Sequence, residues 1–280
     1  MRSSDSMQVV LLGTGTPNAE PERSGPALAI VIAGRSYLVD CGPGVVRRAV
    51  QASRNGLPAL QARNLERVFF THLHSDHTAG YPDLMLTPWV LERQRPLQAF
   101  GPPGLQAMTE HLLSAYQADI RQRLDGLEPA NAGGCQVQVT EIEPGLVYQD
   151  AHLRVQAFAA RHGDWPAFGF RFSTPQRTIV ISGDTAPYPG MVENYAGADV
   201  LVHEVYSAAG FQRRSPDWQR YHASMHTSTT ELAQVALQAQ PGLLVLHHLL
   251  PFGEPEERLV DEIRAICPGP VTLGNDLDVF

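Results

Sequence analysis

Short apolar runs that end in glycine or in polar residues recur along the chain of 280 residues. Runs rich in β-branched residues and closed by turn residues predict strands, and apolar residues at helical spacing predict helices. The expected strands lie at 7–15, 26–44 (a hairpin around Gly34), 65–72, 96–104, 135–142, 153–161, 167–174, 177–185, 198–206, 243–249 and 270–280. The expected helices lie at 44–53, 81–94 (interrupted near Pro88), 105–127, 228–239 (Ser228 and Glu231 forming a capping box) and 254–266.

This order of elements predicts a fold of the α/β class. Both halves of the chain run from strands to helices, and no linker, repeat or low-complexity segment separates the halves. Apolar sheet faces have to be covered by another layer of secondary structure. We therefore expect a four-layer αββα sandwich, with two mixed β-sheets flanked by helices. It forms a single domain over residues 1–280, with a helical insert at about 104–128.

Composition and charge narrow the classes of protein that this sequence fits. The apolar fraction of 43% is that of an ordinary globular protein, and the net charge of -8 argues against a surface that grips nucleic-acid phosphates. Three widely spaced cysteines, Cys41, Cys135 and Cys267, fit a reducing compartment. The apolar run at Val9–Leu12 is too short for a signal peptide, and no stretch suits a membrane span. We expect a cytoplasmic protein that does not associate with membranes.

The segment "FFTHLHSDHTAG" at 69–80 concentrates groups that bind metal ions. His72 and His74 are one residue apart, so an extended chain places both side chains on the same side. Asp76 and His77 follow after a turn and point to a second place. Neutral imidazoles and carboxylates are ligands of zinc-like divalent ions, so this cluster is the first candidate site.

Other strand ends carry the same kinds of residue. His162 follows the strand at 153–161, and Asp184 lies in the polar tip of the strand at 177–185. His247-His248 lies near the end of the strand at 243–249; neighbours on a strand face opposite sides, so only one of them can ligate, and His248 is preferred. Functional groups gather beyond the carboxyl ends of strands. Seven ligands suffice for two ions with one bridging carboxylate, and the ligands expected are His72, His74, Asp76, His77, His162, Asp184 and His248.

"THLHSDH" resembles the HxHxDH signature of the metallo-β-lactamase superfamily, and the later single ligands follow that family's order from "LLGTGTP" to "LHHL". The resemblance implies the metallo-β-lactamase fold and two divalent ions, zinc first, with manganese and iron also suited. It assigns His72, His74 and His162 to one ion. It assigns Asp76, His77 and His248 to the other, with Asp184 as the bridge.

"GTGTP", "VDCGPG", "HEVYS" and "HTSTTELAQVA" resemble the ribonuclease Z-like branch of this superfamily. The resemblance implies that Glu204 and His226 form a relay that protonates the leaving group. Asp76 would also orient the attacking water, and Asp40 would steady a metal ligand. The segment "HTAGYPDLMLTPWVLER" is similar to arylsulfatase-like members as well.

The expected function is that of a dinuclear metal-dependent hydrolase. Members that process transfer RNA carry a long arm, whereas here only residues 163–183 lie between His162 and Asp184. A small phosphodiester or sulfate ester is therefore favoured over nucleic acid as substrate, with an aryl group a further option. The candidates for apolar side chains that contact such a group are Tyr81, Trp89, Trp165 and Tyr206.

Three other functions stay open at this stage. They are a transfer-RNA 3′-processing endonuclease, a lactonase or β-lactamase, and a non-catalytic metal-binding scaffold. The helical insert is read as a lid or a dimer element, and the sequence leaves open whether the chain forms a homodimer.

Overall fold

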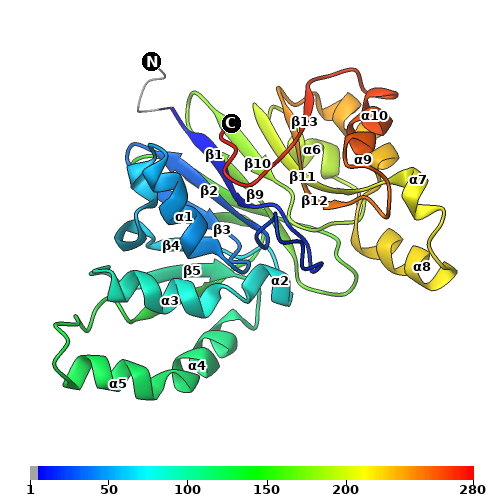
Figure 1. The fold of residues 1–280 in the computed structure, drawn as a ribbon. Coiled ribbons are helices and arrows are strands. Elements are labelled where there is room, and N and C mark those ends of the chain that lie inside the picture. The colour runs from blue at the N-terminus through cyan, green and yellow to red at the C-terminus, as the bar shows by residue number, and fades with distance from the viewer. Residues whose placement is uncertain (1–5) are drawn as a thin grey trace. The chain divides into compact units, whose positions relative to one another are not determined.

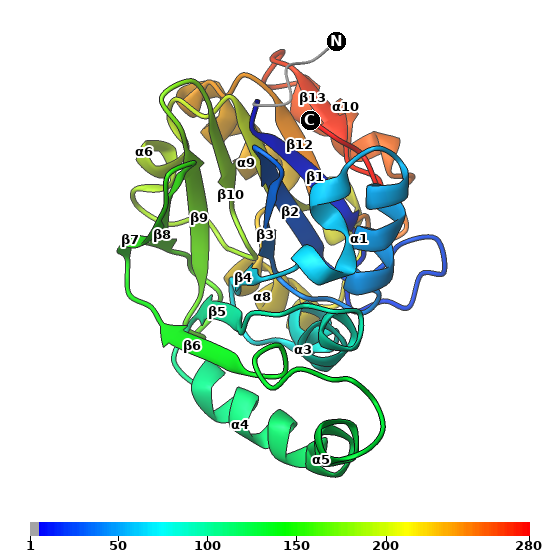
Figure 2. The same cartoon turned by 90° about the vertical axis from the view of Figure 1, so that its left-hand side faces the viewer.

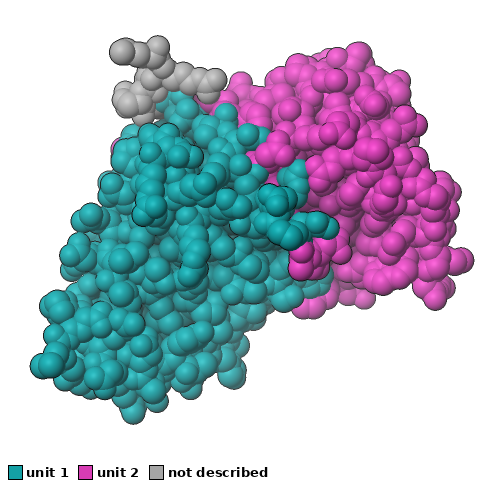
Figure 3. All heavy atoms as spheres, viewed as in Figure 1, with its two compact units in different colours: residues 1–13, 20–142, 276–279 teal, residues 14–19, 143–275, 280 magenta. Residues whose placement is uncertain are grey.

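The computed structural model describes residues 6–280, which form two compact units (Figure 3). Unit 1 holds the residues up to Gly13, Glu20–Ile142 and Asp276–Val279. Unit 2 holds Thr14–Ala19, Glu143–Asn275 and Phe280. Within the part of the chain that is described, no helix has the length and apolar character needed to cross a membrane.

A six-stranded mixed sheet forms the centre of unit 1 (Figure 1). Its order is β1 (Gln8–Gly13), β2 (Ala27–Ile32), β3 (Arg35–Val39), β4 (Arg67–Phe69), β5 (Leu97–Gly101) and β6 (Val137–Glu141). β1, β2 and β3 are antiparallel, and β3 to β6 are parallel. Because β3 and β4 are parallel neighbours, the residues that follow them meet at one edge of the sheet.

Helices pack on the sheet of unit 1 (Figure 2). They are α1 (Val45–Arg54), the short α2 (Ser75–Thr78), α3 (Tyr81–Val90), α4 (Leu105–Ala115) and α5 (Gln117–Asp125). α1 packs against α3 and β1, and α4 packs against β6. The single helix expected over 105–127 is two helices, because the chain leaves helical geometry at Tyr116 (φ -97°, ψ 9°).

The interruption expected at Pro88 is absent, since α3 continues to Val90. A proline inside a helix lacks the N–H that would donate to the carbonyl four residues earlier. That carbonyl is Leu84 O, and the buried Arg93 donates to it at 2.9 Å. Arg93 also donates to the carbonyls of Met85, Leu65 and Gly134. The guanidinium therefore compensates for the missing helical hydrogen bond.

A seven-stranded mixed sheet forms the centre of unit 2. Its order is β13 (Val271–Leu273), β12 (Leu244–Leu250), β11 (Val200–Tyr206), β10 (Thr178–Ile181), β9 (Phe168–Ser173), β8 (Arg154–Ala159) and β7 (Gly145–Gln149). β10 to β13 are parallel and β7 to β10 are antiparallel. β7 was not expected from the sequence, and the strand expected over 270–280 is limited to β13.

Helices also accompany the second sheet: α6 (Met191–Tyr195), α7 (Ala208–Phe211), α8 (Pro216–Met225), α9 (Thr229–Ala239) and α10 (Glu257–Arg264). α9 packs against α6, α10 and β11. The predicted capping box of α9 is present, with Ser228 and Glu231 each accepting from the other's backbone N–H. Each unit thus contains a mixed sheet with helices, and a single domain over 1–280 stays a prediction.

Replacement of Arg93 by methionine is expected to lower the free energy of unfolding by at least about 3 kcal/mol. The substitution leaves four buried carbonyls without their charged donor, and hydrogen bonds to charged groups are worth ~1.5–3 kcal/mol each. Burial lowers the pKa of Arg93 to about 10, so the guanidinium is charged at neutral pH. Urea unfolding of the two proteins measures the difference.

The matched control is Arg95→Met, because the Arg95 side chain is 71% exposed and pairs only loosely with Glu66 at 4.0 Å. An exposed substitution of this kind changes stability by about 0.5 kcal/mol or less. Equal stability losses in the two variants would contradict the role assigned to Arg93.

Candidate metal centre

In unit 1, the predicted ligands lie where β4 ends and α2 begins. His72 and His77 are buried, whereas His74 and Asp76 are partly exposed. The ring centroids of His72 and His74 are 4.7 Å apart, and those of His72 and His77 are 4.2 Å apart. Asp76 Oδ2 lies 3.5 Å from His77 Nε2. The structure therefore brings these four side chains of unit 1 together.

The buried Asp40 carboxylate, just past β3, organises this cluster. Its Oδ1 accepts from the Thr71 N–H at 2.7 Å, and its Oδ2 accepts from the Thr71 hydroxyl at 2.8 Å. Oδ2 also lies 2.8 Å from His77 Nδ1. A carboxylate only accepts hydrogen bonds, so His77 carries its proton on Nδ1 and its lone pair on Nε2.

The same reasoning fixes the tautomer of two further histidines. Because the Thr71 hydroxyl donates to Asp40, it accepts from His72 Nδ1 at 3.0 Å. In unit 2, the backbone carbonyl of Met225 accepts from His162 Nδ1 at 2.8 Å. All three imidazoles therefore present a lone pair on Nε2, as neutral metal-binding histidines do when their other nitrogen is held by a hydrogen bond. This donor chemistry fits a divalent ion.

Glycine lets the "DCGPG" turn pack directly on the histidine segment. Cys41 N–H donates to His77 O, and Gly80 N–H donates to Cys41 O, both at 2.8 Å. A Cβ on Gly80 would lie 2.3 Å from Gly42 O, and one on Gly42 would lie 2.7 Å from Asp76 O. The close backbone approach that positions Asp40 beside His77 is therefore open only to glycine.

In unit 2, Asp184 lies among histidines from other loops. Its Oδ2 is 3.4 Å from His248 Nε2 and 3.9 Å from His226 Nδ1. One ligand atom each from His162, Asp184 and His226 lies within 4.8 Å of the others. The same holds for Glu204, His226 and His248. Strand ends far apart in sequence therefore gather their acidic and imidazole groups within unit 2.

His248 occupies a strained backbone position in β12. Glu204 of β11 pairs with His247, and the next residue of β11, Val205, pairs with Leu249, so His248 is the extra residue of a bulge. Its φ of 49° is left-handed, which is uncommon for a residue with a side chain. Bulges re-aim side chains, and this one accompanies the contact of His248 with Asp184.

Glu204 and His226 form a buried acid–imidazole pair in unit 2. Glu204 Oε2 lies 3.3 Å from His226 Nδ1, and Oε1 accepts from the N–H groups of Thr227 and Thr185. Burial raises the pKa of Glu204 well above its usual value, and the nearby Asp184 carboxylate raises it further. Such a pair can hold and transfer a proton beside the histidine and aspartate cluster.

Two further histidines of unit 2, His203 and His222, lie near this pair, and burial lowers the pKa of both. His203 Nδ1 donates to the backbone carbonyl of Glu204 at 2.6 Å, and its Nε2 lies 3.1 Å from the Tyr195 hydroxyl. Burial lowers the pKa of His203 to about 4. Burial, with His226 and Arg214 nearby, also lowers the pKa of His222 to about 4. Both rings are therefore neutral at neutral pH.

The prediction that aromatic side chains line the substrate site is wrong for three of the four residues. Tyr81, Trp89 and Tyr206 are only 0%, 2% and 4% exposed, so no substrate reaches their rings. Trp165 is 47% exposed. The sequence reasoning missed Trp218 and Tyr221 on α8, which are 50% and 42% exposed. Their spacing of three residues on a helix was the available signal.

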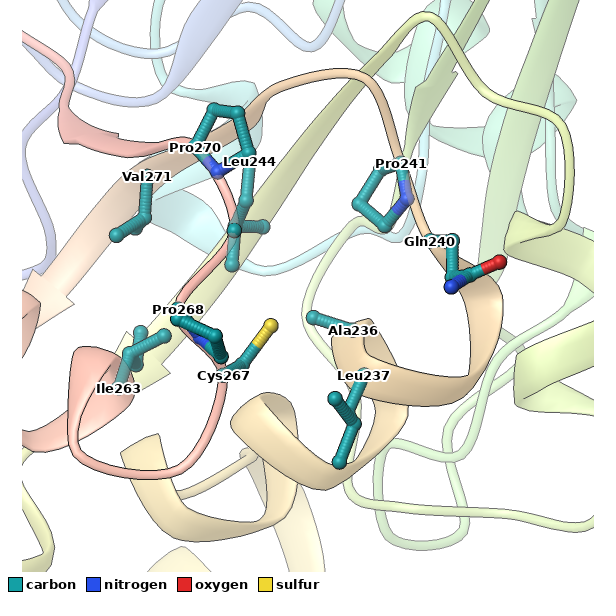
Figure 4. Close-up of a pocket in the computed structure, with 11 residues that line it drawn as sticks. Ala236, Leu237, Gln240, Pro241, Leu244, Ile263, Cys267, Pro268, Pro270 and Val271 are labelled. Carbon is teal, nitrogen blue, oxygen red and sulfur yellow. The ribbon is translucent and has the colours of Figure 1, made fainter.

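A separate cavity of about 280 Å³ lies in unit 2 (Figure 4). Its lining is mainly apolar and comes from α9 and the residues after it, α10, the loop before β13, Val271 of β13 and Leu244 at the start of β12. His248 lies near the opposite end of β12. This apolar cavity is therefore not part of the ligand cluster.

Comparison with known families agrees with this geometry. The family model described as a Beta-lactamase superfamily domain matches residues 35–249. A ribonuclease Z of Mycobacterium marinum is 34% identical over 283 residues, which cover 97% of each chain. A ribonuclease Z of Mycobacterium bovis is 32% identical over 287 residues, covering 97% of this chain and 96% of the relative.

Two solved structures resemble the chain over nearly its whole length. The metallo-β-lactamase fold protein YhfI from Bacillus subtilis has a TM-score of 0.74 at 19% identity, covering 99% of this chain and 100% of the other. The short form of human tRNase Z has a TM-score of 0.72 at 23% identity, covering 98% of each. At these identities the likeness shows a common fold, which confirms the expected fold class.

Asp40→Asn is expected to weaken binding of a divalent ion by about 10- to 100-fold, the usual cost of losing an outer-sphere partner. The amide keeps the shape of the side chain but holds His77 less firmly in its Nδ1–H form. A chelator competition titration with zinc measures the change. The control is Asp125→Asn on α5, where no residue is buried, and it should bind zinc as the wild type does. Unchanged affinity in Asp40→Asn would refute the role of Asp40.

Proposed function

Because the chain belongs to the metallo-β-lactamase superfamily, in its ribonuclease Z-like branch, we propose that this metal-dependent hydrolase cleaves phosphodiester bonds in RNA. Transfer RNA is the first candidate, since the relatives include ribonuclease Z proteins and a tRNase Z. The observation that carries the proposal is the contact of 3.3 Å between Glu204 Oε2 and His226 Nδ1.

A proton donor at this position favours substrates whose leaving group is poor. Hydrolysis of an RNA phosphodiester expels an alkoxide of ribose, which has to be protonated as it leaves. Aryl phosphates and aryl sulfates expel phenolates, which leave without a proton. His226 would donate the proton, and Glu204, held by the N–H groups of Thr227 and Thr185, would keep the imidazole oriented.

We also propose that two divalent ions complete the site. Of the seven predicted ligands, four belong to unit 1 and three to unit 2, so the proposal requires both sets. His72, His74 and His162 would hold one ion; Asp76, His77 and His248 would hold the other; Asp184 would bridge. When bound, such ions would stabilise negative charge on the phosphoryl oxygens and acidify water. Zinc is the first choice because imidazoles predominate.

The absence of a long arm does not separate this chain from its relatives. Residues 163–183 are used by β9 and β10 and the loops beside them. The Mycobacterium marinum ribonuclease Z aligns over 97% of its own length with 97% of this chain, so it has no room for a long extra arm either. The short segment 163–183 is therefore compatible with an RNA substrate, and the net charge of -8 calls for a local cationic contact.

A small aryl ester is the second candidate substrate, and one observation favours it. Trp165 forms an isolated β-bridge with His162 and is 47% exposed, so an aryl group could pack on its ring. A homodimer, a cytoplasmic location and a lid formed by α4 and α5 stay predictions.

His226→Ala is expected to lower kcat/KM for cleavage of a transfer-RNA precursor by ~10²- to 10⁴-fold, the usual contribution of a general acid. The same variant should lose less than about tenfold on bis(4-nitrophenyl) phosphate, because nitrophenolate leaves without a proton. Steady-state kinetics with both substrates, at matched metal content, measure this difference.

His111→Ala is the matched control, since His111 is an exposed histidine of α4. It should cleave both substrates at the wild-type rate. Equal losses of His226→Ala on the two substrates would contradict proton donation by His226. Failure of the wild-type protein to cleave any RNA while it hydrolyses aryl esters would favour the second candidate.

A further inference from the structure

The helix α8, drawn in yellow in Figure 1, carries two exposed aromatic side chains that the mechanism does not use. Trp218 and Tyr221 are 50% and 42% exposed, and their ring centroids are 5.6 Å apart at an interplanar angle of 89°. Residues three apart share one side of a helix. We call this pair the aromatic shelf.

Ring contacts connect the aromatic shelf to the proposed proton donor. The Tyr221 and His226 centroids are 6.4 Å apart. Trp218 stacks on His222 at 5.5 Å and 23°, and His222 lies 5.7 Å from His226. α8 ends at Met225, so His226 directly follows the helix that carries the shelf. A group bound on the shelf would therefore lie close to His226, the proposed proton donor.

Cationic side chains border the same helix. The Arg214 guanidinium lies 5.4 Å above the Trp218 ring and 5.2 Å above the Phe252 ring. Arg213 and Arg220 are exposed, and each pairs with one carboxylate, Glu254 and Asp217 respectively. Residues 211–222 hold three arginines and one acidic residue, within a chain of net charge -8. This local excess of positive charge complements a phosphate backbone.

We propose that the aromatic shelf stacks a nucleobase of the substrate, that of the nucleotide carrying the leaving oxygen. The inference rests on the proposed RNA phosphodiesterase function. Aromatic rings accept any base, because every base has a π-face, and arginine beside the rings adds contact with the phosphates. Trp218 and Tyr221 thus determine where the substrate lies relative to His226, and His226 performs the proton transfer.

A kinetic cycle tests the shelf against a purely structural role. The substrates are a precursor RNA that the wild type cleaves and the same RNA with an abasic nucleotide at the position that carries the leaving oxygen. Wild-type kcat/KM should fall about 5- to 150-fold on the abasic RNA, the usual contribution of one stacked base. The double variant Trp218→Ala/Tyr221→Ala should cleave both RNAs alike. The single variant Trp218→Phe keeps an aromatic ring at this position, so it should keep the preference for the RNA with the intact base.

Tyr116→Ala is the matched control, because Tyr116 is 42% exposed at the junction of α4 and α5. It should keep the wild-type preference for the intact base. A double variant that still discriminates as the wild type does would overturn the shelf while leaving the phosphodiesterase function intact.

Fluorescence gives a readout that needs no turnover. Trp89 is 2% exposed, so in the variant Trp165→Phe the exposed tryptophan is Trp218. Single-stranded RNA should quench its emission, and the further change Trp218→Phe should abolish the quenching. Absence of quenching overturns the shelf whatever the cleavage result. Quenching in a protein that cleaves no RNA would retain the shelf and overturn the proposed function. A changed oligomeric state in the shelf variants, with unaltered RNA binding, would assign the surface to a protein contact.

Discussion

A hydrogen bond to one ring nitrogen sets the orientation of three histidines that are candidate metal ligands, His72, His77 and His162. His77 donates to Asp40, His72 to the Thr71 hydroxyl and His162 to the Met225 carbonyl, in each case through Nδ1. An imidazole fixed in this way keeps its lone pair on Nε2 and cannot rotate without breaking a buried hydrogen bond. The proposed metal site depends on this constraint, because a neutral imidazole binds a metal ion through such a lone pair.

The two units carry different sets of candidate functional groups. Unit 1 offers a local cluster that its own sequence segment almost completes, held against the Asp40 turn by closely packed glycines. Unit 2 offers side chains from several loops and a buried proton-transfer pair, Glu204 and His226. A proton donor matters most for a poor leaving group, so the Glu204 and His226 pair supports the proposal of an RNA phosphodiester as substrate.

The sequence predicted those parts of the structure that depend on local patterning. The hairpin around Gly34, the capping box of α9 and the clustering of His72 to His77 follow from spacing over a few residues. The pairing of Glu204 with His226 came from resemblance to a family, because no local pattern joins residues on separate elements.

The features that the sequence analysis missed depend on contacts between residues that the spacing of residue types along the chain does not reveal. The helix passes Pro88 because Arg93 replaces the lost hydrogen bond, and α8 was missed because its exposed face is aromatic. The bulge at His248 depends on its register with β11. Elemental analysis of zinc-saturated protein tests the proposed set of seven metal ligands most directly. We expect two ions per chain in the wild type, and fewer than two in both His74→Ala and Asp184→Asn. Two ions retained by either variant would contradict the account.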